Sequence, residues 1–174
     1  MSAVRKKAFQ INFNELNEEA QTNLYRNHKD KFEATASKSK YYTVRLMVAK
    51  DEETSEYVLN EMIMEETDFI VFKQIFKSKK LKKTDELIKE LFTSKGFEIR
   101  KIIAYEETSS ELLNWMLKSE IENHVKVRNA LNSVAADIVN NSNFVETAET
   151  KDFLFQNGCY IDGVKDNKLV KELN

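Results

Sequence analysis

A reversal in the sign of charge is the feature of this sequence with the clearest chemical meaning. Eight acidic residues and no basic residue lie between Asp51 and Asp68. Six lysines without an intervening acidic residue follow shortly afterwards: Lys73, Lys77, Lys79, Lys80, Lys82 and Lys83. Clustered lysines neutralise phosphates without reading sequence, whereas specific guanine contacts favour arginine. The lysine run predicts non-sequence-specific nucleic-acid binding; the alternative is a solvated basic face that the acidic stretch neutralises.

Other residue types that carry chemistry are scarce. Only three glycines are present, and they are too scattered for a phosphate-binding glycine loop. Cys159 is the only cysteine, so neither a disulfide nor a common zinc site is expected. Glu120 and His124 have the spacing of two ligands on one helix face, but a helix-surface pair, or a histidine flanking the packed stripe, is the stronger explanation. We therefore expect no metal, no cofactor and no catalytic residues with a recognisable motif.

Composition limits the class of protein. The net charge of −2 gives no global attraction to nucleic acid, so such a partner would need a local patch. No apolar run is long enough to cross a membrane, and none follows the basic N-terminal residues as in a secretory signal. Abundant lysine and asparagine with no proline indicate an AT-rich genome, such as that of a low-GC bacterium, phage or plasmid. We expect a soluble, cytoplasmic protein without membrane contact.

The N-terminal half is predicted to mix strands and helices. Residues 6–13 alternate as in a short strand, and a helix is expected over residues 14–36. Residues 41–49 are rich in β-branched and aromatic side chains, which predicts a strand. Residues 57–64 and 69–76 fit either two strands or two helices, and the spacing of the phenylalanines favours a helix for the second.

The C-terminal half gives stronger local signals. Thr84 is expected to cap a helix, and residues 97–105 are expected to form a strand. A long helix is predicted over residues 109–140, with a break near Asn123 as the alternative to a coiled coil. The Asn-Gly pair within residues 153–161 predicts a β-hairpin.

These elements predict one α+β domain over residues 1–174, with a small, mostly antiparallel sheet packed against helices. The hairpin at 153–161 and the tail at 164–174 are expected as appended elements. We expect a non-enzymatic binding or accessory protein that contacts nucleic acid through the lysine run. One alternative is an assembly or inhibitor protein that binds another protein through the long helix or the hairpin. The other is an enzyme whose acidic site forms only in three dimensions.

Overall fold

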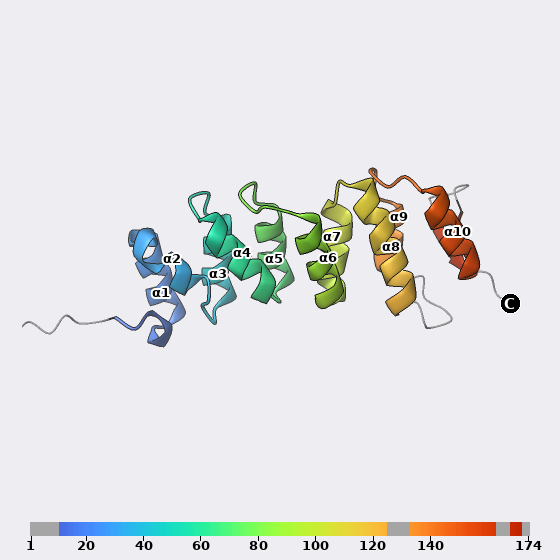
Figure 1. Cartoon of the computed structure of the whole chain (residues 1–174). Coiled ribbons are helices and arrows are strands. Elements are labelled where there is room, and N and C mark those ends of the chain that lie inside the picture. Colours follow the sequence, from blue (N-terminus) through green and yellow to red (C-terminus); the bar gives the residue numbers. More distant parts are fainter. Residues whose placement is uncertain (1–10, 125–132, 163–167, 172–174) are drawn as a thin grey trace, which may run out of the picture. The chain divides into compact units, whose positions relative to one another are not determined.

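The protein is built from helices. A computed structural model describes residues 11–124, 133–162 and 168–171, and within these ranges it contains ten α-helices, one 3-10 turn and two short strands (Figure 1). The helices are α1 (Glu18–Asn27), α2 (Lys29–Ala36), α3 (Tyr42–Lys50), α4 (Glu56–Glu65), α5 (Phe69–Phe76), α6 (Asp85–Ser94), α7 (Phe97–Glu106), α8 (Ser110–His124), α9 (Ser133–Val139) and α10 (Ala148–Gln156). The strands β1 (Cys159–Asp162) and β2 (Lys168–Lys171) pair antiparallel, with Tyr160 opposite Val170.

The predicted α+β class is therefore wrong, because helices supply the core. Residues 41–49 and 97–105, expected as strands, form α3 and α7. Alternation would have buried Phe97 and Tyr105 on the same sheet face, yet these side chains are 42% and 71% exposed. The buried residues of α7 instead recur as neighbouring pairs four residues apart, which is a helical period. Tertiary packing has overridden the β-propensity of these segments.

The remaining sequence predictions had mixed outcomes. Residues 57–64 and 69–76 are both helical, as the phenylalanine spacing favoured for the second, and Thr84 does cap α6. The helix expected over 14–36 is divided at His28 into α1 and α2. Residues 6–10 of the predicted first strand lie outside the described residues, and Phe13 begins the 3-10 turn η1 (Phe13–Glu15).

The predicted C-terminal elements are also displaced. The long helix at 109–140 appears as α8 and α9, and residues 125–132 between them lie outside the described residues. The hairpin predicted at 153–161 is wrong because residues up to Gln156 belong to α10. Asn157 and Gly158 close that helix, with Gly158 in the left-handed conformation at a φ of 65°. The observed strand pair begins only at Cys159.

The chain separates into two compact units, residues 1–80 and residues 81–174. In the first, α1, α3 and α5 follow one another side by side, while α2 packs on α1 and α3, and α4 packs on α5. In the second, α7 lies beside α9, and α8 lies between α6 and α10. The pair β1–β2 contacts α10 and α9. Each unit is thus a stack of short helices in contact with one another; the prediction of a single domain stays a prediction.

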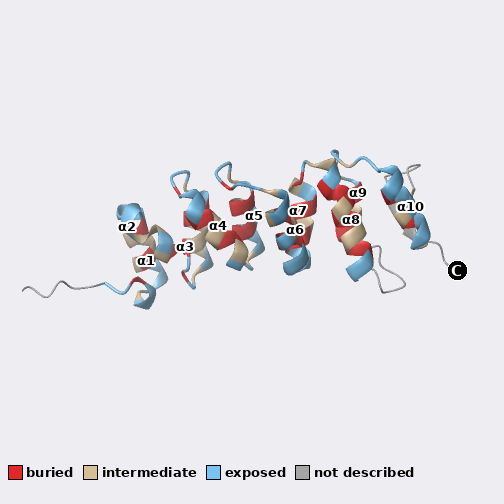
Figure 2. Ribbon diagram, viewed as in Figure 1, coloured by how far each residue is buried: buried red, intermediate tan, exposed pale blue. Residues whose placement is uncertain are grey.

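Local sequence explains where these helices begin. The side chains of Asn17, Ser55, Asp68, Thr84 and Thr147 each accept a hydrogen bond from a backbone N–H in the first turn of the following helix. Such caps satisfy donors that a helix leaves without an internal partner. Several helices then have a broad buried face, which Figure 2 shows in red on α5, α7 and α8. In α5 this face consists of Val71, Phe72, Ile75 and Phe76, all fully buried.

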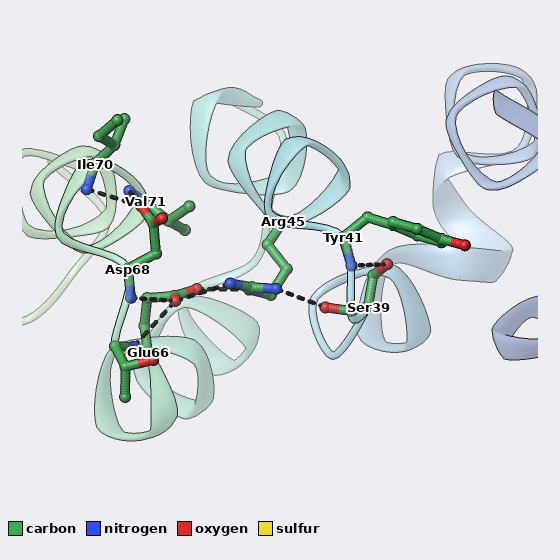
Figure 3. Close-up of polar contacts among 8 residues, drawn as sticks. Ser39, Tyr41, Arg45, Glu66, Asp68, Ile70 and Val71 are labelled. Carbon is green, nitrogen blue, oxygen red and sulfur yellow. Dashed lines mark hydrogen bonds and ion pairs between the residues drawn. The ribbon is translucent and has the colours of Figure 1, made fainter. Parts of the chain in front are cut away.

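An arginine pairs with a buried carboxylate in each unit and joins helices there. Arg45, the fourth residue of α3, contacts both carboxylate oxygens of Glu66 at 2.8 and 3.1 Å and donates to the Ser39 carbonyl (Figure 3). Arg100, the fourth residue of α7, contacts both oxygens of Glu120 at 3.1 and 3.2 Å and donates to the Lys95 carbonyl. Each arginine therefore connects the end of the preceding loop to a carboxylate from a later segment of its unit.

Acidic residues also shape the turns between helices. Oε1 of Glu66 accepts the backbone N–H groups of Thr67 and Asp68, and Oε1 of Glu107 accepts those of Thr108 and Ser109. The Asn141 side-chain amide donates to the carbonyls of Ala104 and Glu107 at the end of α7. These contacts satisfy backbone groups at helix ends, where an unmatched buried group would cost stability.

Replacing Glu120 with alanine will strongly destabilise the second unit. The change leaves the buried guanidinium of Arg100 without its carboxylate, and breaking a buried pair in this way costs about 3–5 kcal/mol. Urea denaturation of the full chain will measure the loss. The double change Arg100→Met with Glu120→Leu should recover much of it because neither charge of the pair then remains buried. Glu149→Ala, at an exposed pair with Lys118, is the control and should have little effect. Equal stability of Glu120→Ala and Glu149→Ala would contradict this role.

Candidate anion-binding site

The predicted lysine site is divided between the two units. Lys73 and Lys77 lie one turn apart on the exposed face of α5 and at its C-terminal end, and Lys79 and Lys80 lie in the loop that follows. Lys82 and Lys83 are also exposed, but they belong to the second unit. The lysine run is thus exposed as expected, while only part of it gathers around one feature of the surface.

That feature is a hollow of about 440 Å³ in the first unit, where the ends of α3 and α5 come together. Its lining is formed by Ala49, Lys50, Asp51 and Glu52 from the first segment and Gln74, Lys77, Ser78, Lys79 and Lys80 from the second. Four lysines and two acidic residues therefore surround it. Lys73, Lys82 and Lys83 do not line the hollow.

Lys50 is the site residue that sequence reasoning missed. It is the last residue of α3, where a basic side chain interacts favourably with the negative end of the helix dipole. A strand over residues 41–49, as the sequence predicts, has no helix C-terminus at which a basic residue would be expected. Lys50 and Lys77 are also far apart in the sequence, so no local sequence pattern contains both. Only the packing of α3 on α5 brings their segments together.

The loop after α5 is held in place by its own hydrogen bonds. The Ser78 backbone N–H donates to the Ile75 carbonyl, and the Ser78 hydroxyl accepts the Lys80 backbone N–H at 3.3 Å. Nζ of Lys80 donates to the Thr54 carbonyl at 3.2 Å. An ammonium group has three donors, so this anchor leaves Lys80 able to donate to an anion as well. The hollow therefore has a defined lining before any ligand arrives.

The acidic stretch forms ion pairs with basic residues outside the lysine run. Nζ of Lys29 lies 2.6 Å from Asp51, and Lys38 lies 3.0 Å from Glu61. Glu66 pairs with Arg45 as described above. Asp51 and Glu52 of the same stretch also line the hollow beside Lys77, Lys79 and Lys80, where they reduce the positive charge. Neutralisation by the acidic stretch and nucleic-acid binding therefore both stay predictions.

Asp51 also belongs to a buried polar cluster behind the hollow. The Tyr25 hydroxyl, on a side chain only 2% exposed, donates to Asp51 at 3.1 Å. Burial acts to raise the pKa of Asp51, but hydrogen bonds from Lys29, the Glu53 backbone and Tyr25 outweigh it and lower that pKa. The pKa of Tyr25 is raised, chiefly by burial and further by the Asp51 carboxylate. Asp51 thus stays an anion that is already hydrogen-bonded from three sides.

The other chemical candidates have structural roles in the described residues. The Glu120 carboxylate is fully buried and bound to Arg100, so it is engaged away from any exposed metal site. Cys159 is buried. No three histidine, cysteine or acidic side chains gather as a metal site within the described ranges. The apolar stripe of the predicted long helix is buried inside the second unit at Leu113, Leu117 and Ile138.

Comparison with protein-family models, with curated proteins and with solved structures gave no match. Among the described helices, none combines the length and apolar character required to cross a bilayer.

Stability should depend on Tyr25 at high pH. The folded-state pKa of Tyr25 lies above its ordinary value of 10.0. The contribution of Tyr25 to the free energy of unfolding is therefore fully present below pH 10. It is lost as the pH rises further, because Tyr25 then ionises in the unfolded chain before it does so in the folded one. The loss is at most about 1.4 kcal/mol per pH unit. Denaturation at pH 8 and pH 11 should show a smaller decline for Tyr25→Phe than for the unchanged chain. Tyr105→Phe, at an exposed tyrosine, is the control. An equal decline in all three proteins would contradict the assignment.

Proposed function

We propose that this protein is a non-enzymatic binding protein that contacts the phosphate backbone of nucleic acid through the lysine-lined hollow of its first unit. The observation that carries the proposal is the convergence of Lys50, from the end of α3, with Lys77, Lys79 and Lys80. Lysines offer mobile point charges suited to phosphates, and their binding releases counterions irrespective of base sequence. The absence of arginine from the lining supports backbone contact over base readout.

The size and form of the hollow also favour an extended polyanion over a small enclosed metabolite. Its lining is dominated by charged side chains at helix ends, whereas pockets for small molecules are mostly apolar with a few placed polar groups. Four lysines around an open site can contact several successive phosphates of a strand. We therefore expect modest affinity at low salt that weakens steeply as salt is added.

A pair of charge-reversal variants tests the hollow against the lysine run as a whole. Lys79→Glu with Lys80→Glu alters the lining, whereas Lys82→Glu with Lys83→Glu makes the same change of net charge at residues that do not line the hollow. Binding of a labelled DNA strand, measured by fluorescence anisotropy at low salt, should fall much further for the first variant. Circular dichroism and thermal unfolding will establish that both variants remain folded.

The same titrations define the results that count against the proposal. Unchanged binding by the Lys79/Lys80 variant would exclude the hollow as the site. Equal losses in the two variants would indicate a diffuse electrostatic attraction without a defined site. If the unchanged protein binds no nucleic acid even at low salt, the proposed function is wrong.

A further inference from the structure

The exposed face of α5 carries an aromatic residue in line with the lysines. Phe69, Lys73 and Lys77 follow one another at intervals of four residues, so they form one strip along the helix. Eight residues of helix place Phe69 about 12 Å along the axis from Lys77. Lys73 lies between them, and Lys77 lines the hollow. A single surface thus leads from an aromatic ring to a group of ammonium ions.

Phe69 differs from the two other phenylalanines of α5. Phe72 and Phe76 are fully buried and stack on each other, with ring centroids 5.7 Å apart. Phe69 is 53% exposed, and the adjacent Ile70 is 46% exposed. Phe72 and Phe76 are therefore core residues, whereas much of the Phe69 side chain remains in contact with solvent. An exposed ring beside a basic surface is the arrangement on which unpaired bases stack.

Side-chain hydrogen bonds fix the backbone of the first turn of α5, which carries the Phe69 ring. The Asp68 carboxylate accepts the backbone N–H groups of Ile70 and Val71 at 2.9 and 3.1 Å. Glu66 in turn accepts the N–H groups of Thr67 and Asp68, and Arg45 holds Glu66 (Figure 3). The backbone that carries Phe69 is consequently held by three linked side chains. A preformed position lowers the entropic cost of binding.

The charges along α5 also specify an orientation. Phe69 directly follows acidic residues, of which Glu65 and Asp68 repel phosphates, whereas the buried Glu66 is paired with Arg45. The opposite end carries Lys77, Lys79 and Lys80. A neutral base therefore fits at the phenylalanine end, and the phosphodiester backbone fits at the lysine end. Duplex bases are stacked within the helix and do not offer a free face to the ring.

We propose that the first unit prefers single-stranded nucleic acid, with one unpaired base stacked on Phe69 and its neighbouring phosphates at Lys73 and the lysine-lined hollow. This inference rests on the proposed function, since the hollow supplies the phosphate contacts. It adds a base-stacking residue, a direction along α5 and a preference for single strands over duplexes. Contacts of this kind tolerate any base, because every base has a face that can stack.

The test separates stacking from charge by comparing the salt dependence of variants. Removal of one base–aromatic stack corresponds to a loss of about 5- to 150-fold in affinity. Phe69→Ala should therefore weaken binding of an oligothymidylate by that factor, with the slope of log affinity against log salt unchanged. Duplex binding should stay the same. Lys73→Ala should weaken binding to both forms and reduce the single-strand slope by about 0.7.

Two further variants test whether the effect of Phe69→Ala comes from loss of the aromatic ring at this position. Tyr105→Ala removes an exposed aromatic side chain from the second unit and should leave binding unchanged. Phe69→Trp should retain affinity, and its added fluorescence should be quenched when oligothymidylate binds. Thermal unfolding will verify that Phe69→Ala folds, as expected for an exposed side chain.

The outcomes distinguish this inference from the proposed function. If Phe69→Ala binds oligothymidylate as tightly as the unchanged protein while the Lys79/Lys80 variant does not bind, the stacking inference is wrong and the phosphate site stands. Equal affinity of the unchanged protein for duplex and single strand would also overturn the preference. If the unchanged protein binds neither form, both proposals fail.

Discussion

Mutual burial of short helices is the constraint on which the structure depends. The described helices contain 7 to 15 residues, and isolated helices of this length are marginal in water. Their stability must come from packing broad apolar faces against one another. In α4 and α5 the buried residues form adjacent pairs that recur four residues later in the same helix. The first pair is Val58 and Leu59 in α4, and Val71 and Phe72 in α5. A face of that width contacts more than one neighbour, which is why the helices of each unit stack against one another.

The two arginine–carboxylate pairs act within this packing. Arg45 and Arg100 each occupy the fourth position of their helix and connect a preceding loop carbonyl with a later carboxylate. Such pairs contribute little net stability compared with apolar residues of similar size, but loss of one partner is costly. They consequently favour one arrangement of loops and helices over alternatives in which a charge is buried alone. In the first unit this arrangement places the start of α5, and through α5 it places the lysines that follow.

The sequence predicted local features of this fold better than its class. Thr84 was identified as a cap, and the spacing of Phe69, Phe72 and Phe76 favoured the helix that forms. The strands predicted at 41–49 and 97–105 were wrong, because β-branched residues there, such as Val44 and Ile103, pack between helices, whereas aromatic residues such as Tyr105 stay exposed. Local composition cannot reveal that a segment is covered by neighbours on two sides. Exposure of the lysine run was also predictable, whereas the contribution of Lys50 required the packing of α3 on α5.

The same geometry connects the fold to the proposed activity. Helix α5 buries one face in the core of its unit and presents Phe69, Lys73 and Lys77 on the other. Its C-terminal loop then supplies Lys79 and Lys80 to the hollow that Lys50 completes from α3. A helix required for folding thus also positions every side chain assigned to binding, apart from Lys50. The proposed role depends on the placement of charge and one aromatic ring.

The most direct measurement is photo-crosslinking of the full-length protein to a single strand that contains 5-iodouracil, followed by mass spectrometry of the linked peptides. The proposed site predicts crosslinks in the peptides that carry Phe69 and the end of α3, and their loss in high salt. Crosslinks confined to the second unit, or none at low salt, would contradict the assignment of nucleic-acid binding to α5 and its adjoining hollow.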